Sequence, residues 1–339
     1  MNRSRIDAHA HLAFDPACTP VLEFVEQTGL RIINTSGSIK PGWHDQGRVP
    51  AYRALAAARP DLFAWVTGFD VPEFDNPNYS ARVVAQLERD FRHHAVGCKL
   101  WRQIGMSIRK PDGTYMLMDD PILDPLYECL IAHNKTLLVH ISEPHARWPG
   151  ARGKTIGFYG RPPSYAPLED EYGVVDFPDA SAQIAAQNRM LAKFPQLRVV
   201  GAHFGGLEHD IRALAAQLDA YPNFAVDTSG RRRDIALQAL RDTDAVRAFF
   251  SRYRDRILWG MDQGTGSTVL TNASDPDTIE RWIAANRDGY AYEFNVYEGA
   301  GVVRVDQYND ISGLDLPGDV LQCMYVDNAL RWYPGAFSG

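Results

Sequence analysis

Two histidines close to the start of the chain are spaced so that they could share a metal ion. They are His9 and His11, in the stretch Ile6-Asp-Ala-His-Ala-His11. In a β-strand the side chains alternate between the two faces, so His9 and His11 would point the same way, one pleat repeat apart. Two imidazoles on one face can bind one metal ion, although two ordinary histidines would give the same local pattern.

Other polar side chains follow later apolar runs, where a parallel barrel would bring them together. The clearest runs are Leu137-Leu-Val-His140 and Val199-Val-Gly-Ala-His203. In chain order, the polar residues at such ends are His9, His11, Thr35, Ser36, Asp70, Lys99, His140, His203, Asp227 and Asp262. Imidazole and carboxylate ligands suit zinc, manganese or ferrous iron, so the whole set predicts a metal site with positions open to water or substrate.

Each of these residues, taken singly, also has an ordinary structural explanation. His140 or His203 could be a hydrogen-bonded core histidine, and Lys99 could be a structural cation. Asp70 and Asp227 could be helix caps, or acceptors that orient a ligand without touching the metal. The prediction therefore depends on their order and spacing together.

Eight short apolar runs alternate with amphipathic segments and are expected to form strands. They cover residues 5–9, 31–35, 62–69, 96–101, 136–141, 197–203, 223–228 and 256–261. Helical periodicity predicts helices near 46–59, 79–93, 120–134, 181–194, 207–220, 242–253 and 275–286, and a closing helix within 316–332. This alternation favours an α/β fold, a closed (β/α)8 TIM barrel forming one domain over residues 1–339, over an open sheet. Active sites of such barrels lie at the carboxyl ends of the strands, where the polar residues are expected.

Two stretches break the alternation. Residues 143–180 are rich in Pro, Gly and aromatic residues and are too long for an ordinary connection, so they predict a lid or substrate loop after the fifth strand. Residues 288–310 alternate Tyr, Phe and Val with small or polar residues and predict a small β-hairpin inserted before the last helix. The hairpin could add a strand to a second copy and make a homo-oligomer. Size-exclusion chromatography with and without it would test that expectation.

Composition and charge narrow the classes of partner. The 339 residues carry a net charge of −7, and no run of Lys or Arg is longer than Arg231-Arg232-Arg233, which argues against nucleic acid. The four widely spaced cysteines favour free thiols over a disulfide framework or zinc knuckle. No apolar stretch has the length of a membrane span and no apolar signal segment precedes the histidine pair, so a cytoplasmic protein without a membrane partner is expected.

The order of these motifs resembles that of the amidohydrolase superfamily. Its barrels carry His-x-His on strand 1, often Lys on strand 4, His on strands 5 and 6, and Asp on strand 8. The narrower resemblance is to the branch that includes aminocarboxymuconate-semialdehyde decarboxylase and related hydrolases. The matching segments span nearly the whole chain: Asp7-Ala-His-Ala-His11, Gly97-Cys-Lys-Leu-Trp101, Asp124-Pro-Leu-Tyr-Glu128, Leu138-Val-His140, Gly201-Ala-His-Phe-Gly-Gly206, Asp227-Thr-Ser229, Ile257-Leu-Trp-Gly-Met-Asp262 and Leu314-Asp-Leu-Pro317.

The resemblance implies a role for each matching position. It makes His9, His11, His140 and Asp262 the ligands of one divalent transition metal, zinc first, with manganese, iron or nickel as alternatives. His203 would orient or polarise the substrate. Lys99 would be unmodified beside one metal or, as the less favoured alternative, carboxylated and bridging two. Trp101-Arg102 stands where many branch members have a histidine and a proline, and the long stretch 143–180 departs from short family loops, so the shape of the substrate pocket does not carry over.

This set of residues suits hydrolysis of a small organic acid derivative, namely a lactone, ester or amide. A divalent metal would activate a water molecule and polarise a carbonyl. Asp262 could take the proton from that water and return it to the leaving group, while His203 polarises the substrate. The same set suits the alternative, a non-oxidative decarboxylase or hydratase acting on a carboxylated aromatic or muconate-like acid. A barrel that had lost its chemistry would lack a ligand, and no key position is missing here.

Substrate contacts are expected from side chains near strand ends and in the long loop. The candidates are Trp101, Arg102, Glu143, Tyr159, Arg161 and Arg231. Guanidinium groups pair with carboxylates through two hydrogen bonds, so they favour a small carboxylate-bearing substrate. Solvated surface arginines and an exposed loop glutamate are the alternatives.

Overall fold

The protein folds around a barrel of eight parallel strands, and the computed structural model describes residues 4–36, 48–148, 168–265, 269–304 and 310–337. The strands follow one another in chain order: β1 Arg5–Ala10, β2 Leu30–Thr35, β3 Phe63–Thr67, β4 Ala95–Leu100, β5 Thr136–Val139, β6 Arg198–Gly201, β7 Phe224–Asp227 and β8 Ile257–Leu258. Ala8 N donates to Trp259 O (3.0 Å) and Asp262 N to His9 O (2.8 Å), so the chain around β8 meets β1 and nearly closes the sheet. The predicted TIM barrel is confirmed.

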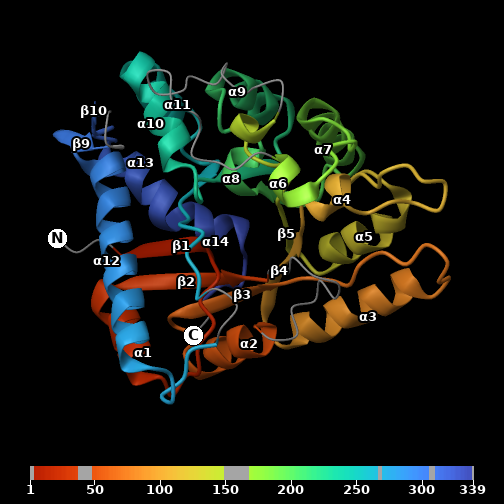
Figure 1. Cartoon of the computed structure of the whole chain (residues 1–339), viewed down its shortest axis with the longest axis horizontal. Coiled ribbons are helices and arrows are strands. Elements are labelled where there is room, and N and C mark those ends of the chain that lie inside the picture. The colour runs from red at the N-terminus through yellow and green to blue at the C-terminus, as the bar shows by residue number, and fades with distance from the viewer. Residues whose placement is uncertain (1–3, 37–47, 149–167, 266–268, 305–309, 338–339) are drawn as a thin grey trace.

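Helices follow the strands and surround them (Figure 1). The longer ones are α1 Thr19–Thr28, α2 Val49–Ala58, α3 Tyr79–Arg92, α5 Asp124–Ala132, α7 Ala180–Lys193, α9 Ile211–Ala220, α10 Arg232–Arg241, α11 Thr243–Arg252 and α12 Pro276–Glu298. Short segments are α4 Gln103–Met106, η1 Pro121–Leu123, η2 His145–Arg147, α6 Leu168–Tyr172 and α8 Ala202–Gly205, and the chain closes with α13 Gly318–Gln322, the π-helical turn η4 Cys323–Asp327 and α14 Asn328–Trp332. Each predicted helix matches one of these, whereas α1 and α10 lie where no helix is predicted.

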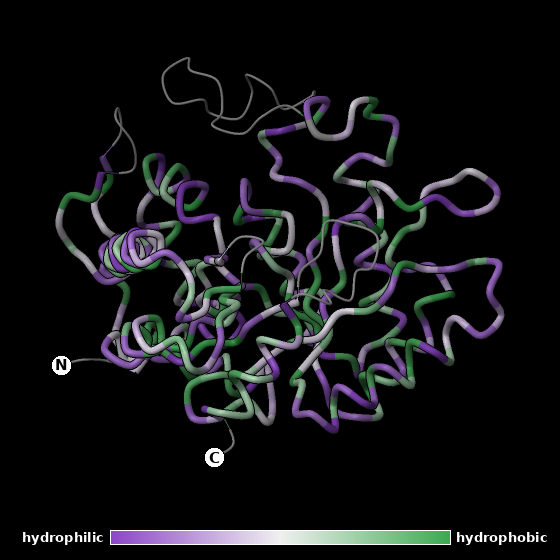
Figure 2. The backbone as a smooth tube through the Cα atoms, turned by 60° about the horizontal axis from the view of Figure 1, so that its bottom comes forward, coloured by the Kyte–Doolittle hydropathy of each residue, from purple (hydrophilic) through white to green (hydrophobic). Residues whose placement is uncertain are grey.

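Strands and helices bury different patterns of residues. All six residues of β4 are buried, as expected for a parallel strand covered on both faces. In α3, Tyr79, Val83, Leu87 and Phe91 recur every four residues, and all four are buried against the barrel. Hydrophobic and hydrophilic segments accordingly alternate along the surrounding helices in Figure 2. The rigid core formed in this way positions the residues at the strand ends.

The predicted hairpin over 288–310 is wrong in its first half. Residues up to Glu298 continue α12, and the hairpin consists of β9 Val302–Arg304 paired antiparallel with β10 Asp310–Ser312, with 305–309 outside the described residues. The alternating Tyr and Phe residues also fit helical spacing. Tyr290 and Phe294, one turn apart, both pack on Trp259, with ring centroids 5.8 and 5.2 Å away.

The long connection after β5 is confirmed between β5 and α7, where it includes η2 and α6. Its residues 149–167, and with them the predicted substrate contacts Tyr159 and Arg161, lie outside the described part of the chain. Among the described residues, no helix is long and apolar enough to cross a membrane.

Candidate metal centre

Three of the predicted side chains converge at the carboxyl end of the barrel. His9 lies in β1, His203 in α8 directly after β6, and Asp262 follows β8. Each offers one ligand atom, and these atoms lie within 4.8 Å of one another. Within the described ranges, this is the one group of three or more histidine, cysteine or carboxylate side chains that meets this distance.

The other two predicted ligands adjoin this group. Nε2 of His11 lies 3.2 Å from Oδ1 of Asp262, and Nε2 of His9 lies 3.7 Å from the same oxygen. The buried His140 ring packs against His203, with ring centroids 4.3 Å apart. Four imidazoles and one carboxylate are therefore neighbours. His140 stays a predicted ligand, since it stands beside the group of three rather than within it.

Hydrogen bonds at Nδ1 fix which ring nitrogen carries the proton. Nδ1 of His9 contacts Oδ2 of Asp227 (2.8 Å), Nδ1 of His11 contacts the Thr35 carbonyl (2.7 Å), and Nδ1 of His203 contacts the Ser229 carbonyl (2.8 Å). Carbonyl and carboxylate oxygens only accept, so each Nδ1 donates and each Nε2 keeps its lone pair. Histidine ligands of metals are oriented in this way.

Burial keeps His11, His140 and His203 neutral, which is the form that binds a metal. It lowers the pKa of His203 to about 3 and that of His11 to about 4, and it holds the pKa of His140 well below its usual range. Burial alone would raise the pKa of Asp262, but the hydrogen bond with His11 and the neighbouring imidazoles outweigh it and hold that pKa well below its usual range. At neutral pH these three imidazoles are therefore neutral and the Asp262 carboxylate is ionised.

The residues present fit a divalent cation. With Nδ1 donating, neutral His9 and His11 each turn an Nε2 lone pair toward Oδ1 of Asp262, at 3.7 and 3.2 Å, so a bound cation would satisfy all three atoms. Lys99 supplies a single cationic donor, its Nζ lying 2.7 Å from Nε2 of His9. A set of imidazole nitrogens and a carboxylate oxygen suits zinc or manganese.

Asp227 orients two of the histidines. Its Oδ2 accepts from Nδ1 of His9, and its Oδ1 accepts from His203 N (2.9 Å), Ser229 N (3.1 Å) and Ser229 Oγ (2.5 Å). Burial would raise the pKa of Asp227, but the neighbouring His9 and these hydrogen bonds lower it to about 2. Of the two explanations left open by the sequence, the structure shows an acceptor that orients a histidine, not a helix cap.

A second buried carboxyl, Asp7, fixes the backbone of the centre and was not anticipated. It accepts from the backbone N–H of His9 and Met261 and from the Tyr290 hydroxyl, each at 3.1 Å. Burial raises the pKa of Asp7 to about 7. The signal available in the sequence is an acidic residue inside an otherwise apolar strand, two positions before His9.

The backbone around the centre adopts conformations that side chains rarely take. His203, Phe204 and Asp262 have φ of +57°, +57° and +61°. Such left-handed conformations cost about 1 kcal/mol or more each and cluster at functional sites. Gly260 allows a close approach, because a Cβ there would lie 2.9 Å from the Cβ of His9.

Lys99 lies at the inner edge of the centre. It is fully buried, and its Nζ stands 4.2 Å from the centroid of the Trp101 ring. Burial lowers the pKa of Lys99 to about 8. The Trp101 ring is also 6.3 Å from His11 and 6.0 Å from His140, so Trp101 forms a wall beside the histidines.

The predicted arginines and glutamate lie near the histidines. The charges of Arg102 and Arg231 contribute to the lowered pKa of His140, and that of Arg231 to the lowered pKa of His203. Glu143 is buried and binds Arg102 (2.5 Å), Arg147 (2.8 Å) and the Tyr172 hydroxyl (3.0 Å). It is therefore not the exposed loop glutamate of the alternative explanation.

Asp70 is not brought into this group. Its backbone carbonyl accepts a hydrogen bond from the Tyr79 hydroxyl at 2.8 Å. The polar residue after β3 therefore belongs to the packing of α3 and not to the cluster of histidines.

Solved structures with the same architecture are distant in sequence. A 2,6-dihydroxybenzoate decarboxylase from Rhizobium is 16% identical over 98% of each chain, with a TM-score of 0.53. A dihydroxybenzoic acid decarboxylase from Polaromonas sp. JS666, with bound manganese and the inhibitor 2-nitroresorcinol, is 14% identical over 98% of this chain and 97% of that one, with a TM-score of 0.53. A putative 2-pyrone-4,6-dicarboxylic acid hydrolase from Pseudomonas putida is 16% identical over 98% of each chain, with a TM-score of 0.49.

At these identities the likeness shows the fold alone. No curated protein sequence matches the chain. A family model does match: the model described as amidohydrolase covers residues 6–335, which include every residue of the centre. The chain therefore belongs to the amidohydrolase family.

Proposed function

We propose that the protein is a metal-dependent hydrolase of a small carboxylate-bearing lactone, ester or amide, with a single divalent ion held by His9, His11, His140 and Asp262. The convergence of imidazole nitrogens on the Asp262 carboxylate carries the proposal, because a divalent cation placed between them would satisfy all of these atoms. The bound ion would lower the pKa of a water molecule and polarise the substrate carbonyl.

Asp262 moves the proton in this proposal, and His203 orients the reacting groups. The Asp262 side chain is 34% exposed while Oδ1 faces the histidines, so its other oxygen is placed to take a proton from the attacking water and to return that proton to the leaving group. With Nδ1 of His203 donating to the Ser229 carbonyl, its neutral ring presents a lone pair at Nε2, which would accept a hydrogen bond from the water or the substrate and hold it in position.

The substrate carboxylate would be bound by arginines near the mouth of the centre. Arg102 and Arg231 are both largely shielded from solvent and act electrostatically on His140. Glu143 contacts Arg102 through Oε1 and can hold its guanidinium in one orientation. Trp101 would lie against the body of the substrate.

A second candidate function is non-oxidative decarboxylation. It is favoured by the relatives with TM-scores of 0.53, which are dihydroxybenzoate decarboxylases, one of them complexed with 2,6-dihydroxybenzoate. In that reaction His203 or Asp262 would first take a proton from water or from a substrate hydroxyl and then deliver it to the ring carbon that loses CO2. The same residues serve both reactions, so the products must decide.

Metal content and product analysis test the proposal together. We expect about one equivalent of transition metal in the purified protein, lost in His11→Ala and retained in both Lys99→Ala and the exposed-lysine control Lys193→Ala. Two equivalents that fall in Lys99→Ala would indicate a carboxylated Lys99 bridging two ions. Carbon-13 NMR of product mixtures then separates the reactions, since decarboxylation alone releases CO2 and leaves a new C–H bond. No metal after reconstitution would refute both candidate functions.

A further inference from the structure

A second cavity lies outside the barrel, away from the metal centre. Its volume is about 1060 Å³, and it is lined by α2, by the turn after α3, by the start of β3 and by the last described residues of the chain. The turn after α3 and the start of β3 stand at the amino ends of strands, opposite the end that carries the histidines. The cavity shares no lining residue with the centre.

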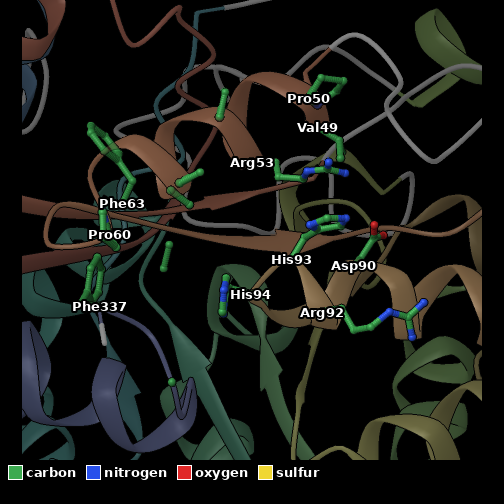
Figure 3. A pocket seen from close by; sticks show the side chains of 15 residues that line it. Val49, Pro50, Arg53, Pro60, Phe63, Asp90, Arg92, His93, His94 and Phe337 are labelled. Atoms are coloured by element: carbon green, nitrogen blue, oxygen red, sulfur yellow. The ribbon is translucent and has the colours of Figure 1, made fainter. Parts of the chain in front are cut away.

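One side of this cavity is cationic. Arg53 from α2 and His93 from the turn after α3 lie next to each other, and His94 follows (Figure 3). Arg92 lines the rim. In the described part of the chain, neither arginine has an ion-pair partner, although both are exposed. Arg59 and Arg82, by contrast, pair with carboxylates.

One acidic residue, Asp90, lines the same cavity. Its carboxylate is buried and accepts from Thr67 Oγ1 (2.6 Å) and Gln86 Nε2 (2.7 Å), which hold it against β3 and α3. Two guanidinium groups and two imidazoles that can donate N–H also line the cavity.

The opposite side of the cavity is apolar. Pro60, Phe63 and Phe337 gather there, with His94 between them and Arg53 (Figure 3). The guanidinium of Arg31 stands 4.9 Å from the centroid of the Phe337 ring and can stabilise that ring through a cation–π contact. A ligand that filled the cavity would therefore meet rings on one side and cations on the other.

The turn that presents the histidines is conformationally unusual. His94 has φ of +65°, a left-handed conformation. Trp65 Nε1 donates to the His93 carbonyl (3.0 Å), which anchors the turn to β3. Left-handed residues other than glycine persist where the surrounding structure fixes them, and they are frequent at ligand sites.

From this lining we propose that the cavity is a binding site for an aromatic carboxylate, with its carboxylate on Arg53, His93 and His94 and its ring against Pro60 and Phe337. Guanidinium groups bind carboxylates through two hydrogen bonds, and the volume is in the range of small-molecule sites. The site is independent of the proposed reaction and does not need the metal.

Photoaffinity labelling with 4-benzoylbenzoate, an aromatic carboxylate that crosslinks on illumination, tests this site in the metal-loaded full chain. We expect labelled peptides from α2 or from residues 335–337, and protection by excess benzoate. Label at the metal centre would be found in different peptides and would be lost in His11→Ala, whereas label in the cavity would remain. Label confined to peptides of the metal centre would overturn the proposal.

Three variants test the assigned contacts. Arg53→Gln alone, and together with His94→Asn, should raise the apparent Kd for the α2 label about tenfold or more, as expected for a lost charged contact. Asparagine tolerates the left-handed conformation of position 94, so the turn is kept. The control Arg89→Gln removes an exposed charge from α3, outside the cavity, and should leave the apparent Kd unchanged. An unchanged Kd in Arg53→Gln would overturn the site, and equal protection by inorganic phosphate would overturn the assignment of an aromatic ligand.

Discussion

Replacing Asp227 by asparagine should weaken metal binding without touching a ligand. The side chain keeps its size, but one of its two oxygens becomes an NH2 donor. Oδ1 accepts three hydrogen bonds, from His203 N and from the N and Oγ of Ser229, whereas Oδ2 accepts from Nδ1 of His9. We therefore expect the asparagine oxygen to stay on the Oδ1 side and its NH2 to face His9.

A donor facing Nδ1 of His9 would force the other tautomer. Nδ1 would then accept, and Nε2 would carry the proton where the metal needs a lone pair. Loss of such an orienting partner costs about 10- to 100-fold in metal affinity, which corresponds to roughly 1.4–2.7 kcal/mol. The lost hydrogen bond from His9 to a charged acceptor should also cost about 1–3 kcal/mol of unfolding free energy.

The assay is a competitive zinc titration against a chromogenic chelator, with urea unfolding of the same samples. Asp90→Asn is the matched control, because Asp90 is also a buried, hydrogen-bonded carboxylate near a strand but contacts no histidine of the centre. It should lose stability and keep its affinity for zinc. If Asp227→Asn binds zinc as tightly as Asp90→Asn does, the tautomer argument is refuted.

Three further predictions follow from other parts of the structure. His203→Asn should lower kcat by about 10²-fold with its metal retained if His203 orients the water or the substrate, and loss of the metal in elemental analysis would instead make it a ligand. Gly260→Ala should lower both metal content and Tm, because the added Cβ would lie 2.9 Å from the Cβ of His9, and an unchanged crystal structure and Tm would contradict this. Burial raises the pKa of Glu293 from 4.5 to about 7. Between pH 4.5 and pH 7 the folded state therefore keeps a proton that the unfolded state has released. The free energy of unfolding should fall by about 3 kcal/mol as the pH rises through this window. Urea unfolding at several pH values in this window should show a smaller loss of stability in Glu293→Gln than in the unchanged protein, because Asp7 contributes equally to both. Equal losses of stability in the two proteins would disprove the assignment to Glu293.

The barrel was predictable because buried parallel strands are short apolar runs that end where the chain reaches the active face. Leu137, Leu138 and Val139 form β5, and His140 follows at once. The same regularity brought Lys99, His203 and Asp262 to that face. The local sequence shows where each strand ends, and a closed barrel of parallel strands brings these ends close together in space.

The contacts that orient the ligands were not predictable, because they join residues far apart in the sequence. His9 and Asp227 are separated by 218 positions, and Tyr290 lies 283 positions from Asp7. The Thr35 and Ser229 groups that fix the tautomers of His11 and His203 are backbone carbonyls, which any residue could supply. No pattern of residue types marks such contacts.

Two helical segments show where local patterns mislead. Tyr290 and Phe294 fit both strand alternation and the spacing of one helical turn, and packing on Trp259 decides for the helix. The charged run Arg231 to Arg233 gives no sign of a helix, yet α10 begins within it. The residues that α10 buries, Ile235, Ala236 and Ala239, come only after this run. A charged first turn is compatible with a helix whose apolar face begins later.

The proposed function places the chemistry and the choice of substrate in different parts of the chain. Asp7 and Asp227 tie β1, β7, the turn α8 after β6 and the chain after β8 into one buried network around the candidate metal centre. The contacts proposed for the substrate lie instead in connections: Arg102 after β4, Glu143 after β5 and Arg231 after β7. We therefore expect that a change in these connections would alter the acid that is bound while the network keeps the histidines oriented. A substrate screen should accordingly vary the body of the acid and keep its carboxylate.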